Sequence, residues 1–281
     1  MKKLFQYLLL IIFVVAVLIW IANFDKPSSQ LTVTFCDVGQ GDAIFIQFPN
    51  QEEMLIDGGP NNSVLNCLGN NMSFYDRKIS FIAITHPDAD HITGLVEVLK
   101  RYEIGTVLLT GAESDNLIYQ KVLDLALDKK TDIRYVNAGQ VYDFGEISAK
   151  IIYPYENYIG QKPTNTNEAS MVIRIEDGNI NYLFTGDIDK RTADKIVAGS
   201  SSVLKSQILK VPHHGSKDFS QEFIKTVNPE ISIISVGAKN RYGHPSQELI
   251  GFLEQSGFKY LRTDKDGDIK IESDGEEYFI K

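Results

Sequence analysis

Residues 84–94 of the chain read ITHPDADHITG, and four potential metal ligands lie within six positions of it: His86, Asp88, Asp90 and His91. The stretch follows an apolar run at residues 79–84 and precedes a helical pattern that starts at Gly94, which places it between a strand and a helix. In an extended loop His86 and Asp88 project to the same side, while the adjacent Asp90 and His91 can turn toward a second point. This spacing suits two neighbouring cations.

The ligand types point to a metal-dependent reaction. Imidazole nitrogens and carboxylate oxygens bind zinc, manganese or iron, and two metals about 4 Å apart stabilise a hydrolytic transition state between them. The alternative is an ordinary polar turn whose Asp caps the following helix. Only two cysteines occur, Cys36 and Cys67, so a cysteine-built zinc module is excluded. We expect these two to be core thiols, with a disulfide as the alternative if the domain lies outside the cytoplasm.

The remaining pattern predicts a mixed α/β domain. Of 281 residues, 43% are hydrophobic and 23% charged, which excludes disorder, collagen and a disulfide scaffold. Strand-like runs occur at residues 31–35, 43–48, 54–56, 79–85, 106–110, 147–153, 171–175, 182–185, 208–211 and 231–236. Helical spacing occurs at residues 94–102, 115–127, 188–198, 220–227 and 246–255. Grouped short strands with helices between the groups favour two sheets packed face to face with helices outside.

The N-terminal segment predicts a membrane anchor. Residues 4–24 carry no charge, and ~20 helical residues span a bilayer core of ~30 Å. A secretory signal would have a shorter apolar core and a small-x-small cleavage site, which residues 20–23 (WIAN) lack. Because Lys2 and Lys3 precede the segment, we expect a single-pass cell membrane protein with its N-terminus in the cytoplasm. Residues 1–24 are then the anchor, 25–30 a linker, and 31–281 one extracytoplasmic domain.

Charge limits the substrate that the domain can bind. Outside the first 24 residues 26 basic residues stand against 37 acidic ones, a net charge of −11, so the surface does not bind polyanions non-specifically. Basic and aromatic residues nevertheless flank the later histidines: Lys217, Lys239, Arg241 and Tyr242. These suit a phosphate-bearing substrate, with Tyr242 available to stack on a base. The alternative is that they are solvated loop residues which offset nearby carboxylates.

Six further motifs occur along the chain, two before this stretch and four after it. They are DVGQGDA at 37–43, LIDGG at 55–59, TGD at 185–187, KVPHHGS at 210–216, SVG through YGHP at 235–245, and RTD at 262–264. Together with THPDADH they resemble the hydrolase domain of ComEC-type DNA-uptake proteins, in the metallo-β-lactamase superfamily. The resemblance runs from about residue 31 to the C-terminus. It implies an αββα sandwich, with the site at one edge between the sheets, and a metal-dependent phosphodiesterase or nuclease.

The resemblance also assigns roles to residues. It implies His86 and Asp88 as ligands of a first metal, Asp90 and His91 as ligands of a second, and Asp187 as a bridging carboxylate. One of His213 and His214 completes the second site; we favour His214 as the ligand and His213 as a catalytic group facing the substrate. The resemblance implies His244 as an acid or oxyanion donor; the alternative is a packed polar residue. Asp42 and Asp57 are expected to orient the glycine turns and the histidines, and Asp42 is also counted among the catalytic residues.

The chain departs from the superfamily pattern at the first metal. The third histidine that usually precedes the Asp187 strand is absent from residues 162–170, where Asn167 and Ser170 stand instead. With Asp88 in place of another histidine, the site is richer in oxygen, which favours a harder ion such as Mn²⁺. We therefore expect one or two divalent ions, Zn²⁺ or Mn²⁺, and no nucleotide cofactor. ComEC-type relatives also carry a multi-helix channel, so any channel here would be a separate membrane partner.

Three functions follow from these observations. The first is an extracytoplasmic phosphodiesterase or nuclease connected with DNA uptake. The second is a hydrolase of another substrate, a phosphorylcholine ester or a lactam, at the same metal site. The third is a metal-poor binding module, which the net charge of −11 disfavours for nucleic acid. For a phosphate ester, we expect a hydroxide to attack phosphorus in line and His213, His244 or water to protonate the leaving oxygen.

Overall fold

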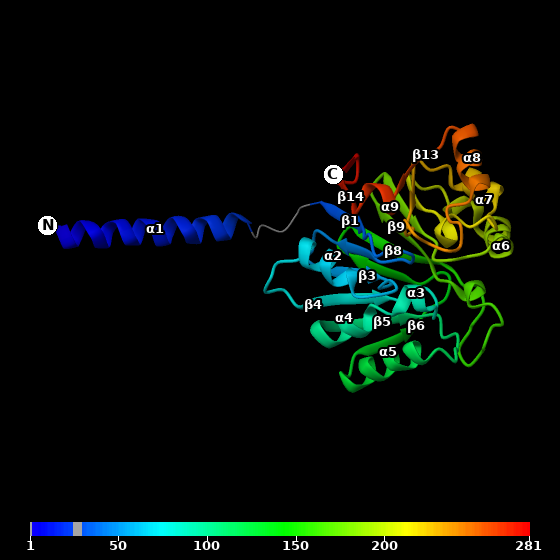
Figure 1. Cartoon of the computed structure of the whole chain (residues 1–281), viewed down its shortest axis with the longest axis horizontal. Coiled ribbons are helices and arrows are strands. Elements are labelled where there is room, and N and C mark those ends of the chain that lie inside the picture. The colour runs from blue at the N-terminus through cyan, green and yellow to red at the C-terminus, as the bar shows by residue number, and fades with distance from the viewer. Residues whose placement is uncertain (1, 25–29) are drawn as a thin grey trace.

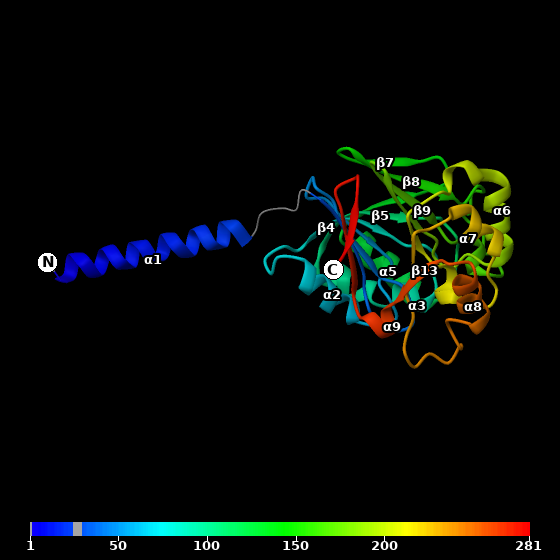
Figure 2. The same ribbon diagram turned by 90° about the horizontal axis from the view of Figure 1, so that it is seen from above.

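Two β-sheets lie face to face, with helices on both outer sides (Figures 1 and 2). The computed structural model describes residues 2–24 and 30–281; the side chains of residues 2 and 18–24 are not described. The first sheet has eight strands in the order β15-β14-β1-β2-β3-β4-β5-β6, and the second has seven in the order β13-β12-β11-β10-β9-β8-β7. The predicted α/β sandwich with two packed sheets is confirmed.

The eight-stranded sheet contains most of the N-terminal half of the domain. Its strands are β1 (Leu31–Phe35), β2 (Ile44–Gln47), β3 (Glu53–Ile56), β4 (Lys78–Ala83), β5 (Glu103–Leu109), β6 (Asp132–Tyr135), β14 (Ile269–Ser273) and β15 (Tyr278–Ile280). The helices α2 (Ser63–Asn71), α3 (Ala89–Ile92), α4 (Leu95–Arg101) and α5 (Leu117–Asp128) belong to the same layer. Residues from these helices and from one face of the sheet form a continuous apolar cluster.

The seven-stranded sheet follows the same plan. Its strands are β7 (Val141–Phe144), β8 (Ile147–Tyr153), β9 (Val172–Asp177), β10 (Ile180–Phe184), β11 (Ile208–Lys210), β12 (Ile231–Ile234) and β13 (Lys259–Arg262). Its helices are α6 (Lys190–Ser200), α7 (Gln221–Val227), α8 (Gln247–Gln255) and the short α9 (Thr263–Asp266). Three 3₁₀ turns complete the chain: η1 (Thr166–Ala169), η2 (Ser201–Val203) and η3 (Pro212–Gly215).

Alternation along each strand divides the apolar residues between two cores. On β2, Ile44 and Ile46 enter the core between the sheets, whereas Phe45 between them enters the core under the helices. Both faces of the strand are therefore buried, which explains why it reads as a continuous apolar run. Between the sheets, the rings of Phe48 and Phe144 stack with centroids 3.8 Å apart.

Several elements were not predicted. The strands β6 and β7 carry exposed charged residues and lack a long apolar run, and β13, β14 and β15 were also missed. Helix α2 reads SVLNCLGNN, and its Asn and Gly residues have low helix propensity. Its apolar face, Val64, Cys67 and Leu68, is nevertheless buried. Tertiary packing therefore stabilises a helix that the sequence alone does not favour.

The two cysteines form a disulfide, so the expectation of core thiols was wrong. Cys36 follows β1 and Cys67 lies in α2, 31 residues further along the chain. The fold brings their Cα atoms to 5.8 Å, within the range that a disulfide needs. Sequence separation carries no information on this distance, because it depends on how α2 packs against the first sheet.

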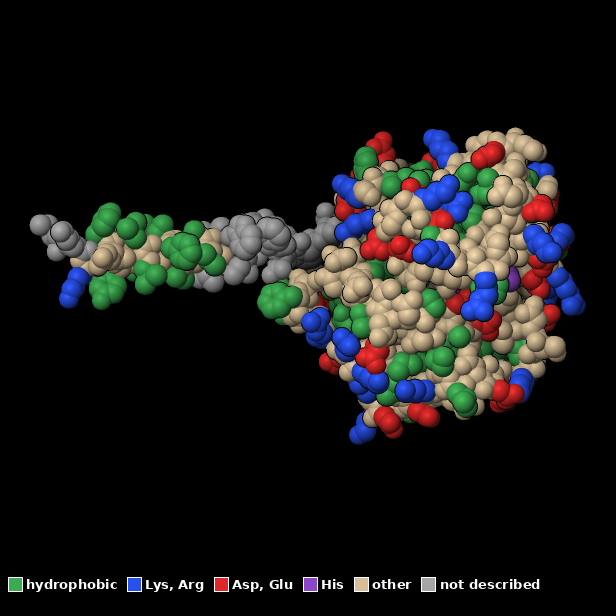
Figure 3. Space-filling model, in the orientation of Figure 1, with side chains coloured by type: hydrophobic (Ala, Val, Ile, Leu, Met, Phe, Trp, Pro, Cys, Tyr) green, Lys and Arg blue, Asp and Glu red, His purple; other side chains and the backbone are tan. Residues whose placement is uncertain are grey.

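The N-terminal segment forms helix α1 (Lys2–Phe24). The large apolar side chains between Leu4 and Val17 are exposed (Figure 3). In the part of the chain that the structure describes, no helix meets the combined length and hydropathy of a membrane span. The linker predicted at residues 25–30 lies, apart from residue 30, outside the described residues.

Strand register defines two opposite ends of the eight-stranded sheet. Thr32 pairs with Gln47, which pairs with Glu53, so β1 and β3 begin at the same end. Strands β4 and β5 run parallel to β3, and therefore Lys78 and Glu103 also begin there. We call this end the entry end, because the chain from α1 enters β1 there. The opposite end, where β3 and β4 finish, is called the ligand end.

Candidate metal centre

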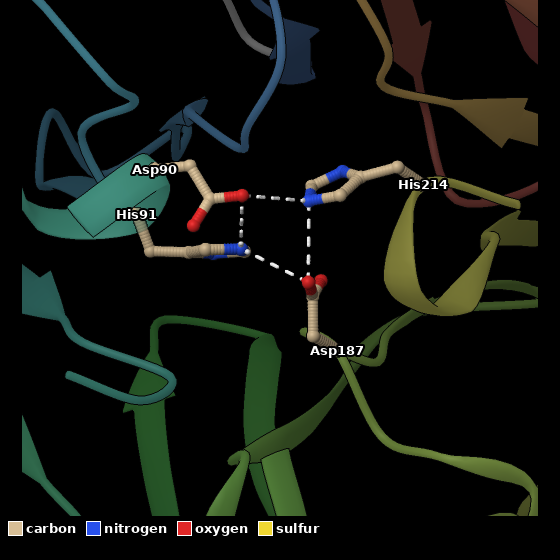
Figure 4. Close-up of side chains that lie close together, drawn as sticks. All are labelled: Asp90, His91, Asp187 and His214. Carbon is tan, nitrogen blue, oxygen red and sulfur yellow. Dashed lines mark ion pairs between the residues drawn. The ribbon is translucent and has the colours of Figure 1, made fainter. Parts of the chain in front are cut away.

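Four side chains converge at the ligand end, two from each layer of the sandwich (Figure 4). Asp90 and His91 lie on α3, Asp187 follows β10, and His214 lies on η3. The Oδ2 atom of Asp187 is 3.3 Å from His91 Nε2 and 3.2 Å from His214 Nε2. The Oδ2 atom of Asp90 is 3.4 Å from His214 Nε2 and 4.0 Å from His91 Nε2. One ligand atom from each residue lies within 4.8 Å of the others, close enough to hold one metal ion.

The hydrogen bonds of the histidines fit this purpose. His91 Nδ1 lies 2.8 Å from Asp57 Oδ2, and His214 Nδ1 lies 3.0 Å from the carbonyl oxygen of Ser235. The buried Nε2 atoms of both rings, and that of His86, have no hydrogen-bond partner among the described residues. A ring whose Nδ1–H is engaged presents a lone pair at Nε2, as a metal ligand must. The unpaired Nε2 atoms therefore fit a divalent metal.

His86 and Asp88 lie beside this group. His86 Nε2 is 3.6 Å from Asp88 Oδ2, and the His86 ring is 4.2 Å from that of His91, measured between centroids. Asp88 accepts a hydrogen bond from Thr166 Oγ1 at 2.6 Å and is partly exposed. These two residues therefore lie close to one another and next to His91, and their assignment to a first metal site stays a prediction.

The double histidine has an unusual backbone. His213 and His214 have φ values of 49° and 54°, in the left-handed region that non-glycine residues rarely adopt. Two consecutive residues in this conformation cost free energy, which the surrounding structure must offset. The turn leaves His214 buried and His213 with 31% of its side chain exposed. Of the two rings, that of His214 is thus the more buried one, and the assignment of His214 as ligand and His213 as substrate-facing group stays a prediction.

His244 reaches the same side of the centre. Its ring lies 5.6 Å from that of His213 and 6.4 Å from that of His214, between centroids. The Asn240 side chain fixes the loop, donating to the His244 carbonyl at 2.7 Å and accepting from its N–H at 3.0 Å. Burial, together with the neighbouring His213 and His214, lowers the pKa of His244 to about 4. Burial also lowers the pKa of His213, although Asp187 opposes that shift.

The carboxylates give the centre a negative electrostatic potential. Burial opposes the charged form of His91, but Asp187 and Asp57 outweigh it and raise the pKa of His91 well above its usual range. Asp187 and Asp42 do the same for the pKa of His214. Burial likewise favours the neutral form of Asp187, yet His214, His91 and Lys210 hold its pKa well below the usual range. Such a site attracts cations.

Lys210 is a site residue that the sequence analysis missed. It is fully buried at the end of β11, where its ammonium donates to the Gly186 carbonyl at 3.0 Å, pairs with Asp42, and lies 3.5 Å from Asp187 Oδ1. Burial lowers its pKa, but Asp42 and Asp187 more than compensate, so the pKa of Lys210 is raised. Lys210 is the first residue of the KVPHHGS motif and ends an apolar run, which was the available signal, but the motif was interpreted through its histidines alone.

Asp42 and Asp57 lie behind the histidine rings. Asp42 is 3.8 Å from His91 Nδ1 and 3.5 Å from His214 Nδ1, on the side away from the Nε2 atoms. Burial alone would raise the pKa of Asp42, but Lys210 and His214 outweigh burial, so the pKa of Asp42 is lowered. Asp42 therefore contacts both rings at Nδ1, and the orienting and catalytic roles expected for it stay predictions.

The remaining predicted residues lie in two groups. Ser170 is buried and its Oγ accepts from the Asp187 N–H at 3.3 Å, while Asn167 Oδ1 has no partner among the described residues. Tyr242 is 66% exposed and its ring lies 5.8 Å from that of His244, nearly parallel. Two exposed basic residues, Lys239 and Arg241, share its loop. Lys217 lines a surface cavity with residues of α6 and α7.

Comparison with known proteins agrees with the fold and the motifs. The model of the metallo-beta-lactamase superfamily matches residues 36–131. The chain is 30% identical over 261 residues to ComE operon protein 3 of Bacillus subtilis. The aligned region covers 86% of this chain and 33% of that protein. It is 26% identical over 247 residues to competence protein ComA of Neisseria gonorrhoeae, with coverage of 87% and 33%. The chain thus spans about a third of the length of these relatives.

A solved structure gives the same fold. The metallo-beta-lactamase fold protein YhfI of Bacillus subtilis superposes with a TM-score of 0.58 at 12% identity, over 87% of this chain and 100% of that one. At this identity the likeness concerns the fold alone. The fold is therefore metallo-β-lactamase-like, and the predicted resemblance to ComEC-type competence proteins is confirmed.

Proposed function

We propose that this chain is a metal-dependent phosphodiesterase that cleaves DNA, with a role in DNA uptake. The observation that carries the proposal is the pair of buried, unpaired Nε2 atoms of His91 and His214 beside the Asp187 carboxylate, with the unpaired Nε2 of His86 on the neighbouring ring. The exposed Tyr242 ring beside His244 adds a surface on which a base can stack. The similarity to competence proteins supports DNA as the substrate.

The residues divide the chemistry among them. Asp90, His91, Asp187 and His214 would hold one divalent ion, and His86 with Asp88 would hold a second that shares Asp187. Bound ions of this kind stabilise phosphoryl oxygens as Lewis acids and lower the pKa of water. Asp57 and the Ser235 carbonyl fix the two rings, and Lys210 holds the remaining oxygen of Asp187. The ligands suit Zn²⁺ or Mn²⁺, with Mn²⁺ favoured at the oxygen-rich first site.

Proton transfer to the leaving oxygen falls to the outward side of the centre. His213 and His244 lie there, with ring centroids 5.6 Å apart. Either ring, or a water molecule, can protonate the departing oxygen. Arg241 and Lys239 on the same loop would bind phosphates on either side of the scissile one.

The test is hydrolysis of linear single- and double-stranded DNA and of bis-p-nitrophenyl phosphate by the purified chain, after metal removal and resupply of Mn²⁺ or Zn²⁺. Metal-dependent DNA cleavage that Asp187→Ala abolishes supports the proposal. Cleavage of the small diester alone would redirect it to a phosphorylcholine ester, and cleavage of a chromogenic lactam would replace it. Tight DNA binding without turnover would indicate a binding module.

We further propose that α1 attaches the domain to the cell membrane as a single pass, with the catalytic domain outside the cytoplasm. Residues 4–24 carry no charge, and Lys2 and Lys3 precede them. The Cys36–Cys67 disulfide supports an oxidising compartment. Protease digestion of intact cells tests this orientation, because only an outward domain is degraded.

A further inference from the structure

Two aromatic side chains project from the loop between α2 and β4, residues 72–77. Phe74 is 85% exposed and Tyr75 is 59% exposed. Their rings contact edge to face with centroids 5.3 Å apart, so they form one aromatic surface. Within the described part of the domain Phe74 is the most exposed of the large apolar side chains. Such exposure in a folded domain indicates a contact surface.

A basic cavity adjoins this loop. Arg77, Lys78, Arg101 and Lys129 line it, together with Tyr102, Glu103, Ile104 and Thr131. Arg77 lies over the Tyr102 ring at 5.5 Å, and Lys129 Nζ donates to the Tyr102 carbonyl at 3.0 Å, so two of the cations are held in place. Glu97 pairs with Arg101 at 3.2 Å, and Glu103 is the one carboxylate among the lining residues. In a domain of net charge −11, this concentration of basic side chains favours an anionic partner.

Both features lie at the entry end. Lys78 and Glu103 begin β4 and β5 at the end where Leu31 begins β1. Three strand spacings separate β1 from β4, which is about 14 Å. Figure 1 shows the loop between α2 and β4 at the side of the body on which the chain enters β1, and Figure 3 shows hydrophobic and basic side chains together at that edge.

We infer that this surface, Phe74 and Tyr75 with the basic cavity, docks the domain on the anionic headgroups of the membrane to which α1 attaches it. Aromatic side chains favour the bilayer interface, and neighbouring cations add attraction to anionic lipids. A nucleic acid is the less suitable partner, because the surface is at the opposite end of the sheet from His86 and Asp187. The inference rests on the proposed attachment through α1.

The experiment uses the full chain in lipid nanodiscs. Because the chain's only two cysteines are paired, Phe74→Cys introduces one reactive thiol for a polarity-sensitive fluorophore. In discs that contain phosphatidylglycerol we expect a blue shift and quenching by nitroxide lipids, both weaker in pure phosphatidylcholine. A label at Lys239→Cys, at the ligand end, should stay in water. Arg77→Glu with Arg101→Glu should reduce the docked-to-undocked ratio at least about fivefold per side chain, whereas Lys217→Glu with Lys239→Glu should not.

Each contrary result has a distinct meaning. A chain that fails to co-elute with nanodiscs lacks the attachment itself, which overturns both proposals. A chain that co-elutes but keeps the residue 74 label in water overturns docking and leaves attachment intact. A label that responds to linear duplex DNA in phosphatidylcholine discs, and not to phosphatidylglycerol, would assign the surface to nucleic acid instead.

Discussion

Lys210 and Asp187 form a buried ion pair in which the ammonium approaches only one of the two carboxylate oxygens. The ammonium lies 3.5 Å from Asp187 Oδ1, while Oδ2 faces His91, His213 and His214. Because Lys210 also pairs with the buried Asp42, it neutralises two carboxylates beneath the centre. The lysine therefore leaves Asp187 one oxygen with which to bind a metal.

Lys210→Met should destabilise the metal-free protein. Removal of one partner from a buried ion pair leaves uncompensated charge, at a cost of about 3–5 kcal/mol in the free energy of unfolding. Urea denaturation in the presence of a chelator measures the change. The exposed Lys205→Met provides the control, and equal stability of the two variants would contradict the proposed role.

Asp57→Asn should weaken metal binding. Asp57 accepts from the Thr85 N–H and hydroxyl and lies 2.8 Å from His91 Nδ1, so it fixes the tautomer of that ligand. Loss of such an outer carboxylate lowers metal affinity about 10- to 100-fold. Competition with a chromogenic chelator reports the affinity, and the exposed Asp143→Asn should match the parent chain. An unchanged affinity in Asp57→Asn would argue against metal binding at His91.

Tyr242→Ala should act on DNA and not on small diesters. Stacking of a base on an aromatic ring is worth about 1–3 kcal/mol, so the KM for single-stranded DNA should rise about 5- to 150-fold. The kcat/KM for bis-p-nitrophenyl phosphate should change little, because that substrate carries no base. An equal loss on both substrates would place Tyr242 in the chemistry instead.

Reduction of the disulfide should lower the free energy of unfolding of the domain. Cys36 and Cys67 close a loop across 31 residues, and such cross-links contribute about 2–4 kcal/mol to the free energy of unfolding. Dithiothreitol should therefore lower the urea midpoint of the parent chain and leave a Cys36→Ser, Cys67→Ser variant unaffected. A parent midpoint that ignores the reductant would mean that the bond contributes nothing.

Stability should fall with rising pH because of Glu53. This residue begins β3 nearly buried, and burial, with Asp76 nearby, raises its pKa to about 8 despite an opposing hydrogen bond from Gln47. Between pH 4.5 and about 8 the unfolded chain loses this proton while the folded chain retains it, so the free energy of unfolding decreases as pH rises. Glu53→Gln should raise Tm more at pH 8 than at pH 5. An equal difference at both values would exclude this linkage.

The sequence predicted what is local and missed what depends on distant partners. His86, Asp88, Asp90 and His91 lie close together in the chain, so their motif was visible. Lys210 was not identified, because only the fold brings Asp42 and Asp187 to it. The prediction of two core thiols was wrong for the same reason, because only the fold brings Cys36 and Cys67 together. The left-handed backbone of His213 and His214 has no signal in residue type, since neither is glycine.

The proposed docking surface and the candidate metal ligands lie at opposite ends of the eight-stranded sheet. The six residues of β4 alone extend about 20 Å from Lys78 toward His86. A domain docked on the membrane through its entry end would therefore hold the histidines at about this distance above the lipid headgroups. A flexible polymer moving parallel to the bilayer can then reach the metal ligands without penetrating the lipid surface.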